Sequence, residues 1–180
     1  MVDYRVASIK GFTDKIGELV FLLEHTRAVT LSEIAEFSQS HLDEPEHDGN
    51  SIGALLSHIA AIEKAHQLIS FEKRDFNAFE YMQWGAAIEL ISEGAREKIN
   101  GKSVDFYIQQ LSDVRKETLK QLSLRNDEWL FEENVWPNGT AYNNYYLWFH
   151  VLEDEINHRG QIRAMKRRIT NAKEQEMGHE

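Results

Sequence analysis

The chain has 180 residues, enough for one domain with its own core, and its 42% hydrophobic, 11% aromatic and 28% charged residues are ordinary for a globular protein. Its formal net charge of -10 excludes the basic surface that nucleic acids or anionic membranes require. The chain has no cysteine, which excludes disulfides, cysteine zinc sites and thiol nucleophiles, so any metal must be bound by His, Asp or Glu. We find no signal peptide and no apolar stretch of membrane-spanning length, and we expect a cytoplasmic protein.

Apolar residues recur at helical spacing over most of the chain, and only two prolines interrupt it. In chain order, we expect helices at about residues 8–25, 31–37, 51–71, 86–99, 104–122 and 143–169. Three of these helices have expected N-caps, which are Thr30 paired with Glu33, Asn50 or Ser51, and Ser103.

The segments between these helices carry turn signals. Residues 41–50 are expected to form a loop, and residues 129–136 a short strand pair or an extended segment before a turn at 137–139. Four long amphipathic helices predict an all-α fold, a four-helix bundle with extra short helices. We assign residues 1–170 to this single domain and residues 171–180 to a frayed C-terminal tail.

The last expected helix carries a core-facing stripe with two polar residues in its middle. The stripe consists of Leu147, Val151, Asp154, His158, Ile162, Met165 and Ile169. A buried carboxylate without a partner is costly, so Asp154 should face a counter-charge or a metal. Asp154 and His158 are four residues apart, which places both on one helix face, as in helices that offer two ligands to one ion.

His58 interrupts the core stripe of the 51–71 helix in the same way, between Leu55 and Ile62. Polar residues at core positions of two helices predict that His58, Asp154 and His158 meet. Two imidazoles and a carboxylate suit zinc, nickel, iron(II) or manganese, and three protein ligands leave a coordination position open. The alternative is a hydrogen-bonded His–Asp pair with His58 bonded to a backbone carbonyl, which needs no metal.

Three other residues near these positions have weaker assignments. His150 lies one turn before Asp154 on a polar stripe, and we interpret it as lining the mouth of the site, as a candidate ligand or base. His66 is interpreted as a packing residue. Gly160, inside a helix, is explained best by the close approach of another element, because glycine weakens helices.

Two segments, SIGALLSHIAAIE (residues 51–63) and HVLEDEINHRGQI (residues 150–162), resemble the ligand-bearing segments of the DinB-like superfamily of metal-binding four-helix bundles. The resemblance covers nearly the whole chain and implies His58, Asp154 and His158 as ligands. Histidine is usual at position 154, but the similar mycothiol-dependent maleylpyruvate isomerases have a carboxylate there and bind zinc. We therefore expect zinc or nickel, with manganese or iron as alternatives.

The resemblance also guides the functional hypotheses. The first is a metal-dependent enzyme that uses a small thiol cofactor, like the bacillithiol- and mycothiol-dependent S-transferases, with His150, Glu63 or Glu155 as proton acceptor. The second is a metal-dependent hydrolase, and the third is a non-catalytic bundle that binds a ligand or partner. We expect a small-molecule substrate and a homodimer. Two motif residues, Arg159 and Gln161, are assigned to the helix surface or a dimer contact.

Overall fold

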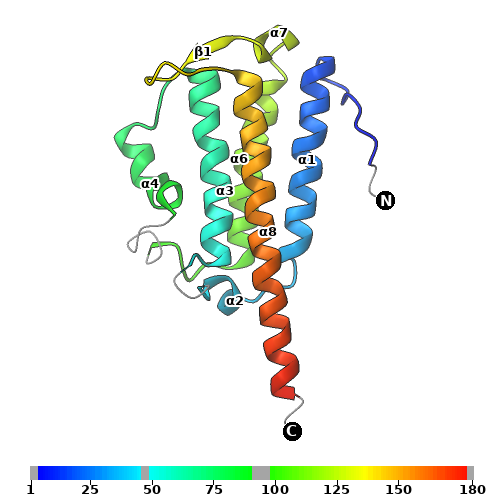
Figure 1. Ribbon diagram of the computed structural model, residues 1–180, viewed down its shortest axis with the longest axis vertical. Coiled ribbons are helices and arrows are strands. Elements are labelled where there is room, and N and C mark those ends of the chain that lie inside the picture. The colour runs from blue at the N-terminus through cyan, green and yellow to red at the C-terminus, as the bar shows by residue number, and fades with distance from the viewer. Residues whose placement is uncertain (1–3, 46–48, 91–97, 178–180) are drawn as a thin grey trace.

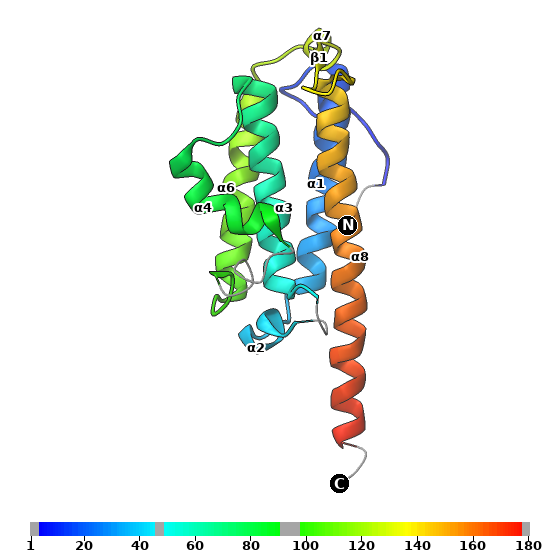
Figure 2. The same ribbon diagram turned by 60° about the vertical axis from the view of Figure 1, so that its left-hand side comes forward.

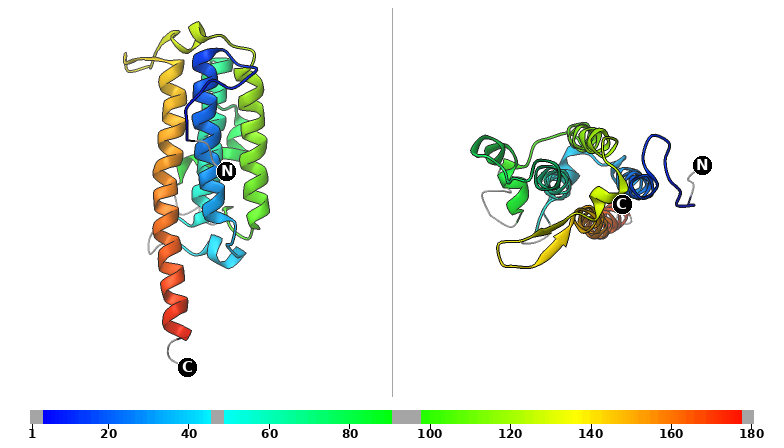
Figure 3. Two further views of the ribbon diagram at one scale, coloured as in Figure 1. Left: turned by 90° about the vertical axis from the view of Figure 1, so that its right-hand side faces the viewer. Right: turned by 90° about the horizontal axis from the view of Figure 1, so that it is seen from above.

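The computed structural model describes residues 4–45, 49–90 and 98–177, and four long helices dominate it (Figure 1). They are α1 (Asp14–Ile34), α3 (Ile52–Gln67), α6 (Val104–Leu122) and α8 (Asn144–Met177). In the view from above in Figure 3, these helices form the four corners of a bundle. The all-α four-helix bundle predicted from the sequence is therefore confirmed. No helix of the described residues is long and apolar enough to cross a membrane.

Two of the expected N-caps are confirmed. The Ser51 hydroxyl accepts a hydrogen bond from the amide of Ala54 at the start of α3, and the Ser103 hydroxyl accepts one from the amide of Phe106 at the start of α6. These caps satisfy amide groups that have no partner inside their own helix. A short π-helix, η1 (Leu68–Glu72), continues α3 near its predicted end.

The N-terminal elements differ from those predicted. Residues 8–13 precede α1 as an irregular segment, and α1 continues past the expected boundary to Ile34. The predicted cap at Thr30 is wrong, because Thr30 is buried inside α1 and its hydroxyl donates to the carbonyl oxygen of Thr26. No glycine or proline separates the two predicted helices, so the helix has no reason to stop there. The predicted loop contains a short helix, α2 (Gln39–Asp43).

The helix predicted at residues 86–99 begins earlier in the structure. Helix α4 (Ala78–Glu89) starts at an Asn77 capping box and lies outside the bundle, beside α3 (Figure 2). The signal for this start was the pair Asn77 and Glu80, whose side chains each accept a hydrogen bond from the other residue's backbone amide. Residues 91–97 of the predicted helix lie outside the described residues.

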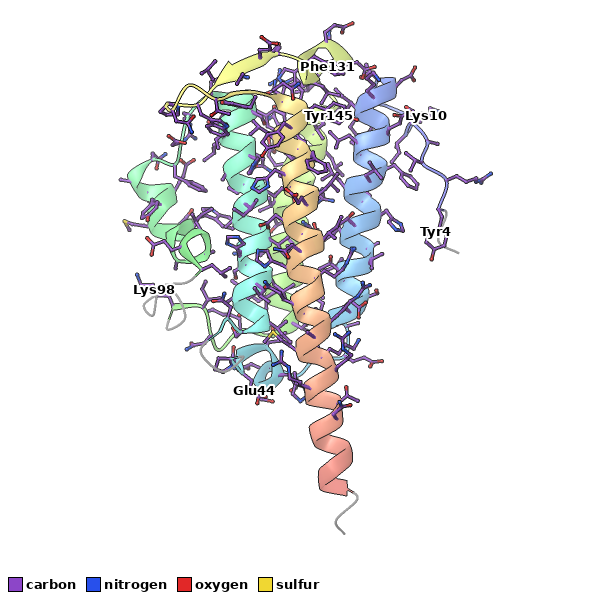
Figure 4. All side chains as sticks on the ribbon, viewed as in Figure 1. Tyr4, Lys10, Glu44, Lys98, Phe131 and Tyr145 are labelled. Atoms are coloured by element: carbon purple, nitrogen blue, oxygen red, sulfur yellow. The ribbon has the colours of Figure 1, made fainter. Side chains whose placement is uncertain are left out.

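The region before the last helix contains a strand pair, of which only the first strand lies within the predicted residues 129–136. Strand β1 (Glu133–Val135) pairs with β2 (Ala141–Asn143) in an antiparallel hairpin, and the short helix α7 (Asp127–Leu130) precedes it. Aromatic contacts stabilise this region: Trp136 stacks on Tyr142 at 4.0 Å within the hairpin, and Phe131 contacts Tyr145 of α8 edge to face at 5.8 Å, which links the cap to the bundle. Figure 4 shows Phe131 and Tyr145 together at this end of the bundle.

Helix α8 crosses both halves of the core and then extends beyond the bundle, to Met177 (Figure 1). Val151 and Leu152 pack in an apolar cluster with α1, and Ile162 and Met165 pack in a second cluster with α3 and α6. The polar residues of α8 at positions 154, 155 and 158 lie between these two clusters. The fold therefore places a polar layer inside an otherwise apolar core.

Candidate metal centre

The structure brings His58, Asp154 and His158 together, as the stripes on the two helices predicted. One ligand atom from each residue lies within 4.8 Å of the other two. Asp154 Oδ1 lies 3.6 Å from His58 Nε2 and 3.3 Å from His158 Nε2, and the two imidazole rings are 4.9 Å apart at nearly a right angle. Donor atoms bound to one tetrahedral zinc ion at 2.0–2.2 Å lie roughly 3.3 Å apart, so the spacing fits such an ion.

Both histidines are oriented through the ring nitrogen that points away from Asp154. His58 Nδ1 donates to the carbonyl oxygen of Ala87 on α4 at 2.7 Å, and His158 Nδ1 donates to Gln161 Oε1 at 3.0 Å. In the neutral form of each ring, these bonds leave Nε2 as the nitrogen with a lone pair, directed at the site. Metal-binding histidines are commonly fixed in this way. Gln161 is exposed on the helix surface, as the sequence predicted, and the structure adds this orienting contact.

The charges of the three side chains are coupled. Burial opposes ionisation of Asp154, but His158 and His58, which in their protonated forms donate from Nε2 to this carboxyl, outweigh burial and lower its pKa. Burial likewise opposes protonation of His158, but Asp154 raises its pKa. Asp154 Oδ2 is buried and accepts no hydrogen bond from any described residue. A buried carboxylate oxygen without a donor, beside two imidazole lone pairs, fits a bound divalent cation.

Two of the three predicted proton acceptors lie in a separate buried cluster, which we call the ion network: Arg27, Glu63, Arg115 and Glu155. Glu63 is fully buried and receives hydrogen bonds from Arg27, from Arg115 and from the Thr118 hydroxyl. Glu155 receives two from Arg27, at 3.0 and 3.2 Å. Both glutamates therefore face α1 and α6 and are paired with arginines.

Burial alone would raise the pKa of Glu63, but Arg115 and Arg27 lower it to about 2. Glu63 in turn raises the pKa of Arg115 despite its burial. Neither arginine was predicted as a buried partner from the sequence, although each carries a signal. Arg27 lies at helical spacing between the buried residues Leu23 and Thr30, and Arg115 follows the buried Leu111 by four. A charged residue on a core stripe indicates a buried partner.

The third predicted proton acceptor, His150, lies on the open side of α8. Its side chain is 42% exposed, and its Nδ1 lies 3.4 Å from Glu153 Oε2. His150 and Asp154 both line a groove of about 700 Å³ beside α1 and α8, whose other lining residues include Leu22, Phe149 and Ile156. Asp154 is therefore accessible from solvent through this groove, and His150 lies on the wall of the same groove.

The structure adds detail to two expectations about the motif in α8. Arg159 is half-buried, and its Nη1 donates to the carbonyl oxygen of Thr26, so this residue ties α8 to α1. Gly160 has no atom within 4 Å of the position a Cβ would occupy, so no element of the described chain approaches it closely. The helix face at Gly160 is open.

Comparison with known proteins identifies the family. A crystal structure of an uncharacterised protein from Escherichia coli UTI89 superposes with a TM-score of 0.64 at 16% identity, covering 86% of this chain and 94% of that one, which supports the fold. No curated protein sequence gives a significant match. The family model for mycothiol-S-transferase matches residues 18–171, which include all three residues of the candidate metal centre. The chain therefore belongs to the mycothiol-S-transferase family of DinB-like proteins.

Proposed function

We propose that the protein is a metal-dependent S-transferase, which joins the sulfur of a small thiol to an electrophilic small molecule. The observation that carries the proposal is the cluster of His58, Asp154 and His158, in a chain that matches the mycothiol-S-transferase family. The chain has no cysteine, so the reacting sulfur has to come from a thiol cofactor. The cofactor proposed is mycothiol or a low-molecular-weight thiol of similar chemistry.

The metal proposed for the cluster is zinc or nickel, with manganese or iron as alternatives, held by His58 Nε2, His158 Nε2 and an oxygen of Asp154. Such an ion supplies the acidity that keeps a bound thiol in its nucleophilic thiolate form at neutral pH. The protein keeps the two Nε2 lone pairs directed at the site through the contacts of His58 with Ala87 and of His158 with Gln161. Both histidines are largely buried, which limits the access of water.

Among the three proton-acceptor candidates, the surroundings favour His150. Arginines already hold the carboxylates of Glu63 and Glu155, so protonating either one breaks ion pairs in the core. His150 is half exposed and shares the groove with Asp154, so it can exchange a proton with solvent and with a substrate in the groove. The apolar residues of the groove, such as Phe149 and Ile156, suit an electrophile with an uncharged, apolar body.

The test is transfer of a thiol to monochlorobimane by untagged protein loaded with zinc or nickel. The thiols are mycothiol, bacillithiol, glutathione and coenzyme A, supplied one at a time. We expect metal-dependent turnover with at least one thiol, its loss in Asp154→Ala, and its retention in Asn157→Ala, which changes an exposed residue of the same groove. The absence of metal-dependent turnover with every thiol contradicts the proposal. Metal-dependent cleavage of esters without thiol would indicate the hydrolase instead.

We also propose that the functional form is a homodimer that pairs through α8. Tyr146, Phe149 and Ile156 are each about half exposed, and they share one face of α8 with Gly160, where the surface is open. A second copy of this helix could pack closely at Gly160 and cover the outer sides of the three apolar side chains, with Phe149 and Ile156 then forming a wall between the partner helix and the groove. Sedimentation of the wild type as a dimer and of Phe149→Glu as a monomer is the expected result. A monomeric wild type contradicts it.

A further inference from the structure

A second pair of histidines lies on the same interface of α3 and α8 as the candidate metal centre. His66 follows His58 by two turns on α3, and His150 precedes Asp154 by about one turn on α8. The two imidazole rings are 5.3 Å apart with an interplanar angle of 58°. The rings of His58 and His158, in comparison, are 4.9 Å apart. The interface therefore repeats the same motif, one histidine from each helix.

The hydrogen bonds of this second pair repeat those of the first. His66 Nδ1 donates to the carbonyl oxygen of Ile62 at 2.7 Å, and a carbonyl oxygen can only accept, so the lone pair of this ring is on Nε2. His150 Nδ1 faces the Glu153 carboxylate at 3.4 Å, which favours the same tautomer. Backbone carbonyls and carboxylates are the usual partners of metal-binding histidines. Two rings can pack against each other without a carbonyl or a carboxylate bound to either Nδ1.

The protonation of His66 also suits a metal ligand. The residue is 6% exposed, and this burial lowers its pKa to about 4, although the hydrogen bond to the carbonyl oxygen of Ile62 acts in the opposite sense. The imidazole of His66 is therefore neutral at neutral pH, in the form that binds metal ions without competition from a proton.

We propose that His66 and His150 form a second binding site for a transition-metal cation of the zinc class, separate from the site of His58, Asp154 and His158. Two imidazoles bound through nitrogen at 2.0–2.1 Å to one tetrahedral ion have ring centres roughly 5 Å apart, which matches the observed spacing. His66 is the buried, fixed ligand. His150 is the half-exposed ligand on the groove, through which the ion enters and where water or another small ligand completes the coordination.

The proposal of a second site does not depend on the proposed thiol transfer. An ion bound there should nevertheless change the rate of that reaction. An ion bound to His150 occupies the ring nitrogen that the proposed reaction uses as a proton acceptor. Metal beyond the first equivalent is therefore expected to lower the rate of thiol transfer. If excess metal still inhibits a variant without His66, the second site is not the cause of the inhibition. The number of zinc ions bound would still test the site itself.

The test is the number of zinc equivalents bound by metal-free, untagged protein in competition with a chromophoric chelator. We expect two equivalents in the wild type and one in His150→Ala and in His66→Gln. Asp154→Ala should keep one equivalent, and adding His150→Ala to it should remove that one. The matched control is His25→Ala, which removes a half-buried histidine of α1 and should still bind two. Circular dichroism and urea unfolding check that each variant is folded.

Two results overturn the proposal. The first is the same stoichiometry in His150→Ala and the wild type, because His150 is on the surface and its loss should leave the fold intact. The second is a single equivalent in the wild type that Asp154→Ala abolishes, which would make His66 and His150 a packing pair. Cobalt(II) titration provides a second readout, since the visible absorption of the second equivalent should disappear in His150→Ala. Neither result depends on whether the protein transfers thiols.

Discussion

The bundle contains two buried polar clusters that differ in one respect. In the ion network, Glu63 and Glu155 lie against Arg27 and Arg115, and protein donors engage both carboxylates. In the candidate metal centre, Asp154 Oδ2 has no donor among the described residues, and each histidine directs a lone pair at the same space. Burial is therefore not what distinguishes a functional cluster, because both clusters are buried. The distinction is whether the protein itself satisfies every polar atom.

This difference predicts a large effect of breaking the ion network. The variant Glu63→Ala leaves Arg27 and Arg115 without their central partner in the core, and we expect the free energy of unfolding to fall by about 3–5 kcal/mol. Urea unfolding of metal-free protein measures the loss. The matched control is Glu24→Ala, since Glu24 contacts Arg115 from a half-exposed position and should contribute at most about 1 kcal/mol. Similar losses in both variants would contradict the importance we assign to Glu63.

Acid should weaken the ion network as Glu63 is protonated. The pKa of Glu63 is about 2 in the folded protein against 4.5 as a reference, so its stabilising contribution is complete above pH 4.5 and is lost as the pH falls towards 2. The loss is on the order of 3 kcal/mol. Urea midpoints measured across this range should fall less steeply in Glu63→Gln than in the wild type. Equal slopes would assign the acid sensitivity to other carboxylates.

Breaking the candidate metal centre should affect metal binding more than stability. Zinc at a hundred times its dissociation constant should stabilise the wild type by about 2.7 kcal/mol, and Asp154→Ala should lose most of this gain. Without metal, we expect the variant to unfold within about 1 kcal/mol of the wild type, because the loss of two contacts is offset by the removal of a buried carboxylate. Unfolding with and without zinc measures both quantities. If zinc raises the free energy of unfolding of Asp154→Ala as much as that of the wild type, Asp154 is not a ligand.

The smallest effect is expected from the residue that orients a ligand without binding the ion. Gln161→Ala removes the acceptor of His158 Nδ1, and zinc affinity should fall roughly 10- to 100-fold with unchanged stoichiometry. The control is Asn157→Ala, one turn earlier on the exposed side of α8, which should bind zinc like the wild type. Competition titrations measure both variants. Unchanged affinity in Gln161→Ala would mean that the hydrogen bond does not orient the ring.

The sequence determined the helices with strong periodicity and clear caps, and through them the candidate metal centre. Asp154 and His158 could be placed on one face because helical spacing alone decides that, and His58 stood out because a polar residue interrupted an apolar stripe. The predicted break in α1 was wrong because a capping pattern at Thr30 was given more weight than the absence of any residue that ends a helix.

What the sequence could not decide is which polar side chains of different helices meet. Glu63 and Glu155 were candidate proton acceptors, and only the packing of α1 and α6 shows that arginines hold them. His66 was assigned to packing because it continues the apolar stripe of its own helix, and only the packing of α8 against α3 brings the ring of His150 to 5.3 Å from it. The physical reason is that the spacing of residues decides on which face of its own helix a side chain lies. Which neighbouring helix that face contacts depends on how the four helices pack together.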